Sequence, residues 1–434
     1  MIRMTRFKVL SLLAVWAVPS MFFVGGSDPA QTQSGPQEAV TGFDNEDNGF
    51  AREFCANQRR LTDSPNSPLI PDAECNLATA IEEFTGPEAD ADGVGPIFNA
   101  RGCGECHVAN QILGATSQFT EKRAGLFLNG VFTDHPGGSL IQDRAYNPND
   151  QERTIAASTN VTALRSTLSV LGDGFVEAIA NTTLQNIANN QPAAQRGQLI
   201  NVPVFEAPGQ TRVGRFGHKG QQASLVSFSA DAYVNEMGIT SPLQPDENTS
   251  NGRPATFAPD APPHGPGQVD NEGVDVELFA LFMRATKAPP VDAALAATPD
   301  AQAGRQLFSS IGCATCHTPT IVTAAPGTLI NGGAMRVANS LGNKIIHPFS
   351  DFLLHDVGTG DGIVQNGGPT TRNKIRTAPL WGLRARGRFM HDNLSFGFED
   401  AIARHGNQAA TARQNFNNLG AGDRRRVLAF LSSL

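Results

Sequence analysis

The chain has 434 residues, 40% of them hydrophobic, which is enough for two or three domains with buried cores. Its 44 glycines and 28 prolines predict long irregular connections between the regular elements. The net charge of −8 argues against nucleic acid as a partner and favours a basic protein instead.

The N-terminus has the pattern of a secretory signal. Arg3, Arg6 and Lys8 form a basic start, and residues 9–24 are nearly all apolar. This run is shorter than the roughly 20 residues of a membrane-spanning helix. We therefore expect residues 1–26 to be a signal peptide cleaved near residue 26, with export to the periplasm. An uncleaved N-terminal anchor is the alternative.

Residues 27–90 are predicted to form an N-terminal extension. Residues 27–42 are polar and lack periodicity, which indicates a tail, and residues 43–62 look helical. Cys55 and Cys75 belong to no other motif, and such a pair in an exported protein usually forms a disulfide. Closing this loop of about 20 residues would stabilise the region by roughly 3 kcal/mol. Two buried free thiols are the alternative.

Two segments carry the pattern Cys-x-x-Cys-His, which is the attachment signature of covalently bound haem c. They are Cys103, Cys106 and His107, and Cys313, Cys316 and His317. The two thiols bond to the haem vinyl groups, and the histidine supplies the proximal iron ligand. A Cys-x-x-Cys pair alone could bind zinc or exchange disulfides. Two copies that end in histidine favour two haem c groups.

Each motif follows an aromatic residue at the same distance. Phe98 and Phe308 both stand five residues before the first motif cysteine, as expected for an N-terminal cytochrome c helix that packs against haem. Residues 214–219 (GRFGHK) are echoed by residues 387–392 (GRFMHD). The sequence therefore predicts a tandem duplication with one haem in each half.

The remaining patterns are mostly helical. Residues 241–273 are rich in Pro, Gly, Asp and Asn and predict a loop, and residues 274–287 have helical spacing with Phe279, Phe282 and Met283 inward. Residues 423–434 predict an amphipathic helix capped by Asp423. No alternating run looks long enough for a large sheet. We expect a mainly α fold of two cytochrome c-like domains, 91–290 and 291–434, with long irregular loops.

Several separate segments resemble the bacterial di-haem cytochrome c peroxidase superfamily, which includes MauG. The similarity is greatest to a branch described only as di-haem oxidoreductases, or as thiol-oxidoreductase-like proteins, and it covers roughly residues 90–434. The segments are 92–101, 235–243, 352–358, 377–383 and 389–392.

The resemblance implies a ligand for the second haem. In the peroxidases, the axial methionine of the electron-transferring haem follows an aromatic–His–Asp motif by fourteen residues, which places His405 fourteen after His391. A second haem ligated by His317 and His405 would have a lower potential than a His–Met haem. Met390 is the competing ligand, and a surface histidine is the alternative role for His405. MauG-like enzymes have tyrosine there, and neither Tyr146 nor Tyr233 is near.

The first haem is the catalytic one by the same resemblance. Glu236 matches a glutamate of the peroxidase distal pocket, where it would move a proton between the peroxide oxygens. Capping a helix end is the alternative role for Glu236. His218 matches a position where relatives often have tryptophan, and it is a pocket residue, an axial ligand or a packing residue. His135 could be a removable loop ligand or a surface histidine.

Other residues are expected near the second haem. His355 and Asp356 could bond to a propionate, and alternate spacing on an extended segment would direct Arg384, Arg386 and Arg388 to the propionates. Relatives also bind calcium between their domains, mainly through backbone oxygens, and no residue type here indicates such a site.

The resemblance predicts a peroxidase-like enzyme. Electrons from a small redox protein would enter at the second haem and pass to the first, where hydrogen peroxide is reduced. A non-enzymatic di-haem electron carrier and an oxidase of organic or protein substrates are the alternatives.

Overall fold

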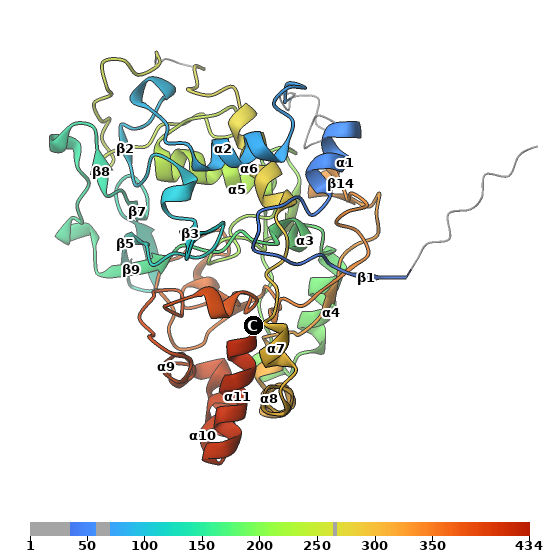
Figure 1. Cartoon of the computed structure of the whole chain (residues 1–434). Helices are drawn as coiled ribbons and strands as arrows, with labels where there is room; N and C mark the ends of the chain where they lie inside the picture. The colour runs from blue at the N-terminus through green and yellow to red at the C-terminus, as the bar shows by residue number, and fades with distance from the viewer. Residues whose placement is uncertain (1–34, 58–69, 264–266) are drawn as a thin grey trace, which may run out of the picture. The chain divides into compact units, whose positions relative to one another are not determined.

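The computed structural model describes residues 35–57, 70–263 and 267–434, and residues 36–434 form one compact unit (Figure 1). The predicted signal peptide, residues 1–26, lies outside the described residues. Within the described ranges, no helix combines the length and apolar character needed to cross a membrane. Residues 238–263 and 267–273 contain no helix or strand, which confirms the predicted loop for its described part.

The predicted mainly α fold is wrong. The structure is 34% helical and 16% strand, so it is a mixed α/β fold with several small sheets. The helices are α1 (Phe50–Asn57), α2 (Leu77–Thr85), α3 (Asp173–Glu177), α4 (Asn181–Asn190), α5 (Leu225–Ala232), α6 (Val274–Ala285), α7 (Ala293–Ala296), α8 (Pro299–Ser310), α9 (Phe398–Ala403), α10 (Ala410–Asn418) and α11 (Ala421–Ser433).

The largest sheet has four antiparallel strands. β5 (Thr120–Leu128) pairs with β6 (Val131–Asp134), β7 (Leu140–Ile141) and β9 (Val161–Ser166). Its sequences, TEKRAGLFL and VTALRS, contain charged residues on the face that turns inward, and they therefore lack the apolar alternation that indicates a half-buried strand. This inward charge is why the sequence did not reveal the sheet.

The other strands form short pairs. β1 (Gln37–Glu38) pairs in parallel with β15 (Lys344–Ile346), which also pairs with β12 (Ile321–Val322), so the predicted tail ends as a strand. The remaining pairs are β2 (Ile97–Phe98) with β8 (Arg144–Ala145), β3 (Val108–Ala109) with β4 (Ile112–Leu113), β10 (Asn201–Pro203) with β11 (Thr211–Val213), β13 (Leu329–Ile330) with β14 (Met335–Arg336), and β16 (Leu354–His355) with β17 (Ile375–Arg376).

Two helix pairs form the apolar cores beside the two motifs. α2 packs against α6, and α8 packs against α11. Phe84 of α2 packs against Phe282 at 4.3 Å between ring centres, and Phe308 of α8 contacts Phe430 at 5.3 Å. Phe279, Phe282 and Met283 are buried as predicted. The structural counterpart of Phe308 is therefore Phe84, whereas Phe98 lies in a strand.

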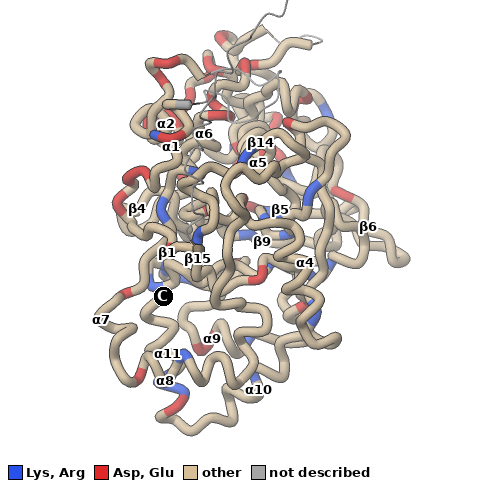
Figure 2. The backbone as a smooth tube through the Cα atoms, turned by 90° about the vertical axis from the view of Figure 1, so that its right-hand side faces the viewer, with Lys and Arg blue, Asp and Glu red and all other residues tan. Residues whose placement is uncertain are grey.

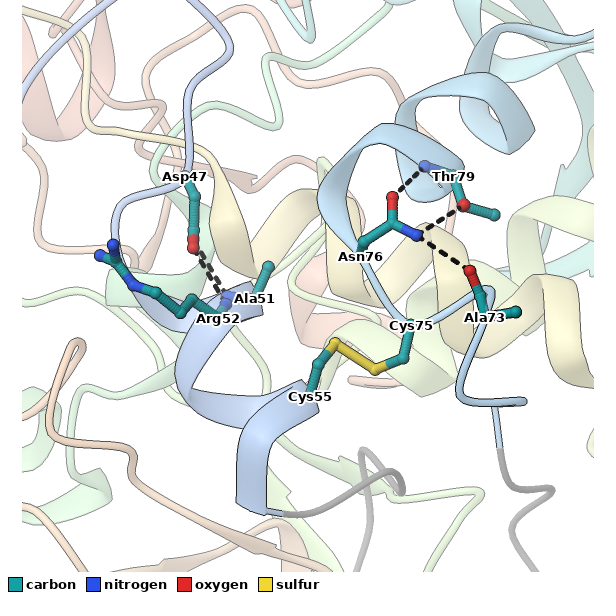
Figure 3. Close-up of a disulfide and its surroundings, with 8 residues drawn as sticks. All are labelled: Asp47, Ala51, Arg52, Cys55, Ala73, Cys75, Asn76 and Thr79. Carbon is teal, nitrogen blue, oxygen red and sulfur yellow. Dashed lines mark hydrogen bonds between the residues drawn. A yellow bond between two sulfur atoms is a disulfide. The ribbon is translucent and has the colours of Figure 1, made fainter.

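The N-terminal region is joined to this core. α1 begins where the Asp47 carboxylate accepts hydrogen bonds from the backbone of Ala51 and Arg52, and Asn76 caps α2 by accepting from Thr79 (Figure 3). The structure links Cys55 and Cys75 by a disulfide with 5.5 Å between their Cα atoms. α1 and α2 thus contribute side chains to the first core.

The C-terminal helix begins two residues earlier than the sequence predicted. α11 starts at Ala421 with Gly420 as its N-cap, so Asp423 lies in the first turn instead of at the cap position. Val427, Phe430, Leu431 and Leu434 are buried and pack with α8.

The repeated six-residue segments adopt the same turn. Phe216 bridges to Gln222, and Phe389 bridges to Ser395, in matching antiparallel pairs. The fourth residue of each segment has a positive φ: 75° at Gly217 and 66° at Met390. A methionine rarely adopts this conformation, which glycine reaches without strain. The turns place the two repeat histidines, His218 and His391, with 6.5 Å between ring centres.

Candidate functional site: two cavities beside the Cys-x-x-Cys-His motifs

Both motifs fold into the same tight turn. Cys103–Glu105 and Cys313–Thr315 are single 3₁₀ turns, in which the backbone N–H of the motif histidine donates to the carbonyl of the first cysteine. The N···O distances are 2.9 Å at His107 and 3.0 Å at His317. This turn directs two cysteine side chains and one imidazole toward one cavity, and none of the four motif cysteines forms a disulfide.

The two motif histidines are oriented in the same way. Nδ1 of His107 lies 2.8 Å from the Leu168 carbonyl, and Nδ1 of His317 lies 3.0 Å from the Phe349 carbonyl. Such a bond fixes the tautomer and leaves Nε2 available to a metal. Burial lowers the pKa of both imidazoles, to about 4 for His317, so they are neutral and can act as ligands. Phe84 and Phe308 pack on these rings at 6.0 and 6.1 Å.

The first cavity, of about 140 Å³, holds acidic and basic side chains as well as the motif. It is lined by Cys103, Cys106 and His107, and also by Glu121, Arg123, Arg165, His218 and Glu236. The large sheet supplies Glu121 and Arg123 from β5 and Arg165 from β9. Cys103 and Glu236, which are 133 positions apart in the chain, thus meet in one pocket.

Two carboxyl groups in the first cavity share a hydrogen bond and have opposite pKa shifts. Desolvation and the neighbouring Glu121 carboxylate raise the pKa of Glu236 to about 8. Although burial alone would raise the pKa of Glu121, the Arg123 and Arg165 guanidiniums lower it to about 2. The pair therefore carries one proton near neutral pH, and that proton is on Glu236.

The backbone holds Glu236 in place. Glu236 lies in a single π-helical turn, Tyr233–Met237, an element that is often found at functional sites. The turn ends at Gly238, whose φ is 77° and where a Cβ would lie 2.5 Å from the Gly95 carbonyl. Asn99 donates to the Glu236 carboxylate at 2.6 Å, and its backbone N–H donates to the Glu236 carbonyl at 2.7 Å.

The second cavity, of about 210 Å³, has a second imidazole facing the motif histidine. The ring centres of His317 and His405 are 6.4 Å apart. Two imidazoles on opposite sides of a metal that lies about 2 Å from each nitrogen have ring centres about 6 Å apart. Nδ1 of His405 lies 2.8 Å from the Ala401 carbonyl, so its Nε2 is also available. Met390 lines the same cavity.

Only one of the three predicted propionate-binding arginines faces the second cavity. Residues Leu383–Ala385 form a 3₁₀ turn and not an extended segment, so alternate residues do not share a face. Arg384 donates to the Pro290 carbonyl, and Arg388 lies over the Phe396 ring. Arg386 lines the cavity, and its buried Nε has no hydrogen-bond partner in the structure. A haem propionate is an anion that would satisfy this nitrogen.

His218 lines both cavities. Its Nε2 lies 2.7 Å from the Ser166 carbonyl, which is the opposite arrangement to that of His107, His317 and His405. Burial and the nearby Arg165 lower its pKa to about 3, so the ring is neutral. His218 is therefore a pocket residue between the cavities, and its Nε2 is engaged by the protein.

The other histidines singled out by the sequence fall into two groups. His355 lines the second cavity, with Nε2 2.8 Å from Asp351 and Nδ1 3.7 Å from the Cys316 sulfur. His135 is buried away from both cavities: its Nδ1 lies 3.1 Å from the Pro136 carbonyl, and its Nε2 accepts from the Ile155 backbone. His135 has no free ring nitrogen for a metal.

The charge of the surface differs between the two ends of the chain. Figure 2 shows acidic residues gathered on α2, α6 and the loops beside them. Residues 291–434, which line most of the second cavity, have 14 Lys and Arg and 9 Asp and Glu. This half therefore carries a net positive charge, although the whole chain is acidic.

The residues of both cavities fit a covalently bound haem. Each cavity has two thiols and a neutral, oriented imidazole, and the second also has an opposing imidazole and an unpartnered guanidinium nitrogen. Sequence reasoning identified the motifs, Glu236, His218 and His405. It missed Asn99, Glu121, Arg123 and Arg165. The two charges at positions 121 and 123 alternate as they would on one face of a strand, and that was the available signal.

Comparison with known proteins gives one family. Residues 145–434 match the model of the family described as "Di-haem oxidoreductase, putative peroxidase". No curated protein matches the chain.

Three solved structures show weak likeness. Hydrazine synthase of Kuenenia stuttgartiensis is 14% identical over 99% of this chain and 100% of that chain, with a TM-score of 0.40. A MauG-like protein associated with microbial copper homeostasis is 16% identical over 39% and 54% of the two chains, with a TM-score of 0.26. The di-haem peroxidase BthA of Burkholderia thailandensis is 18% identical over 37% and 50%, with a TM-score of 0.25. With TM-scores this low, these likenesses carry no argument about function.

Proposed function

Because this chain belongs to the di-haem oxidoreductase family, we propose that it is a c-type di-haem enzyme of peroxidase type, which accepts electrons at the second cavity and reduces a peroxide at the first. Family membership makes it an oxidoreductase. We propose, beyond this, that two haems are attached covalently, that electrons pass from the second to the first, and that the substrate is a peroxide.

Seven residues would hold the two haems. Cys103, Cys106 and His107 would attach and ligate the first, and Cys313, Cys316 and His317 the second. His405 would be the other axial ligand in the second cavity, supported by its 6.4 Å distance from His317. When bound, the haems supply one-electron chemistry and an iron that binds peroxide.

The observation that carries the proposal is the hydrogen-bonded Glu121–Glu236 pair, which lines the first cavity together with the motif residues. Glu236 can release a proton to an oxygen of a bound peroxide, because its pKa of about 8 keeps it protonated near neutral pH. Asn99 fixes the Glu236 carboxyl, and the ionised Glu121 accepts the shared hydrogen bond. His218 is neutral and borders this pocket, where it would orient groups rather than carry charge.

The difference between the cavities supports a division of roles. A haem held between His317 and His405 would suit electron transfer, because neither side of it would be open to a substrate. The first cavity instead has an acid, an ionised carboxylate and two guanidiniums facing the motif. This difference favours an enzyme over a carrier with two closed irons.

The same proposal includes the domain boundaries, the electron donor, the substrate and the location of the enzyme. We propose a first haem domain of residues 91–290, to which the packing of α2 on α6 adds residues 77–85, and a second of residues 291–434. The electron donor would be a small redox protein and the substrate hydrogen peroxide or a related small oxidant, with no nucleic acid. We keep the proposal of a signal peptide and a periplasmic location.

The test is Glu236→Gln in the haem-loaded protein. Peroxide reduction by pre-reduced protein, followed by stopped flow, should slow by about 10²–10⁴-fold, as expected for loss of a general acid. Haem content and melting temperature should stay close to those of the parent. Turnover within about threefold of the parent, with the haems intact, would remove Glu236 from the mechanism. Loss of stability with normal turnover would instead indicate a helix cap.

A second measurement separates the enzyme from a carrier. Spectra of the half-reduced protein, with and without hydrogen peroxide, should show high-spin iron that responds to peroxide. Iron that is low-spin in every redox state would contradict the peroxidase proposal.

A further inference from the structure

A second hollow lies beside the first cavity, on its outer side. It has a volume of about 660 Å³, is open to solvent and is lined by both charged and apolar residues. Three residues, Asn99, Phe119 and Glu121, line both this outer cavity and the first cavity. Because Glu121 is one of the three and also hydrogen-bonds to Glu236, it joins solvent on one side to Glu236 on the other.

The sheet fixes the Glu121 carboxylate in this boundary. Arg123, two residues along the same strand, donates from Nε at 2.7 Å and from NH2 at 3.2 Å to the two carboxylate oxygens. Such a two-point contact sets the orientation as well as the charge of a carboxylate. Arg165 on the neighbouring strand β9 lies 3.9 Å away. Asp361 in turn holds Arg165 at 2.6 Å, and both side chains are fully buried.

The charged and titratable groups that face Glu236 come from several elements. β5 supplies Glu121 and Arg123, and β9 supplies Arg165. α5 supplies Asp231, whose own pKa is raised by burial, and the motif turn supplies Cys106. His218 lines the same cavity as a neutral ring. Among these groups, only Glu121 both contacts Glu236 and lines the outer cavity.

We infer that Glu121 is a positioning residue that keeps the reactive proton on Glu236 and connects that carboxyl to the outer cavity, through which the proton is replaced. This inference depends on the proposed function of Glu236. Phe119 and Asn99 form the rest of the wall between the cavities and do not exchange protons in the neutral range.

The proton balance of the step is simple. Glu236 transfers its proton to a peroxide oxygen and becomes a carboxylate, so the pair then carries two negative charges. A solvent acid in the outer cavity, hydronium or a buffer acid, protonates Glu121. The proton passes along the shared hydrogen bond to Glu236, and Glu121 returns to its ionised state beside Arg123. Reduction of one peroxide to two waters takes up two protons and two electrons, and the electrons come from the donor protein.

The experiment follows the Glu236 proton directly in the haem-loaded full chain. Infrared difference spectra give a protonated-carboxyl band, which is assigned to Glu236 by its loss in Glu236→Gln. Its titration midpoint and its rate of exchange after mixing with D₂O are measured in the parent, Glu121→Gln and Asp143→Asn. Asp143 is the matched control, because its exposed carboxylate lines the same outer cavity without contacting Glu236.

Glu121→Gln removes the negative charge that favours the protonated form of Glu236. We expect the midpoint of the band to fall by about one to three pH units, the usual effect of a charge in contact. The exchange of the carboxyl proton should slow by roughly tenfold or more, because an amide does not relay a proton. Asp143→Asn should leave both quantities as in the parent. An unchanged midpoint and exchange rate in Glu121→Gln would overturn the inference.

Glu121→Asp covers the case in which Glu121→Gln does not load haem. It keeps the charge but lengthens the gap to Glu236, so the midpoint should lie between those of the parent and a charge-free site, with slower exchange. Parent values in this variant would also overturn the inference. The proposed function fails separately, by normal peroxide turnover in Glu236→Gln, because the infrared titration does not depend on turnover.

Discussion

The two cavities have the same motif geometry and different opposing residues. His107 and His317 sit in the same 3₁₀ turn, with the same Nδ1 bond to a carbonyl and the same phenylalanine contact. Facing His317 is another imidazole, His405, whereas the first cavity presents the Glu121–Glu236 pair. In the proposed function, the duplicated motif would fix how each haem is attached, and the surrounding elements would decide what that haem does.

The two cavities differ because different structural elements surround the motif in each half of the chain. The helix pairs α2/α6 and α8/α11 are equivalent, but only the first half has the four-stranded sheet, which brings Glu121, Arg123 and Arg165 to the motif. The second half has α9 and the turn after it, which carry His405. The halves meet at the ion pairs of Asp361 with Arg165 and Lys219, at 2.6 and 2.8 Å.

The largest expected effect is the loss of one haem when the two cysteines of one motif are replaced. Replacing both Cys103 and Cys106 by Ser should remove the covalent haem of the first cavity only, and the same change at Cys313 and Cys316 that of the second only. Each paired variant should give about half of the parent signal in a pyridine haemochrome assay, because each motif supplies its own two thioether bonds. Full covalent haem in either double variant would contradict the assignment.

The Cys55–Cys75 disulfide should contribute to the stability of the first half of the chain. Cys55→Ser with Cys75→Ser removes the crosslink between α1 and α2 and should lower the free energy of unfolding by about 3 kcal/mol. Denaturant unfolding of the haem-loaded protein would measure the loss. Haem content should not change, which makes this pair the control for the motif variants. Unchanged stability would mean that the crosslink adds nothing to the α1–α2 contact.

His405→Met tests through the redox potential whether His405 is a ligand of the second haem. Replacing the opposing imidazole by a thioether should raise the potential of the second haem, on the order of 0.1 V within the roughly 0.8 V range that axial ligands span. The first haem should keep its potential in the same spectroelectrochemical titration. Met390→Leu is the control, because Met390 lines the same cavity and is the competing ligand. A shift in Met390→Leu, and none in His405→Met, would reverse the ligand assignment.

The smallest expected effect is a pH-dependent change in stability at a cluster of three carboxyl groups on and near α2 and α6. Carboxylate oxygens of Glu83, Glu88 and Asp275 lie within 4.8 Å of one another, and burial with the neighbouring charges raises the pKa of Glu83 from 4.5 to about 8. A raised carboxyl pKa means that the folded state binds the proton more tightly. Stability from this group is thus complete below pH 4.5 and is lost as the pH rises to about 8.

Glu83→Gln mimics the protonated carboxyl and should therefore remove the loss of folding stability at high pH. Its melting temperature should equal that of the parent near pH 5 and exceed it near pH 9, by an amount equivalent to about 1 kcal/mol or less because solvent screens a half-buried site. Glu82→Gln, on the exposed side of α2, is the matched control and should show a smaller difference. A pH-independent effect would show that the charge on Glu83 does not matter.

Local sequence patterns were enough to predict the features of this protein that depend on neighbouring residues. The Cys-x-x-Cys-His motifs, the helix at Val274–Ala285 and the repetition of the Gly-Arg-Phe segments depend on residues close together in the chain, so their patterns were sufficient. Glu236, His218 and His405 entered only as matches to a family, because nothing local distinguishes a pocket acid from a helix cap.

The tertiary structure decided the fold class and the partners of these residues. The sheet of β5 and β9 was missed because its inward positions are charged. Those charges are stable there because they pair within β5, between β5 and β9, and with Asp361 of the second half. The pairing of Glu121 with Glu236 spans 115 positions, and the packing of Phe84 in place of Phe98 depends on where α2 folds back. Such contacts are set by the burial of distant segments against each other, which no local pattern records.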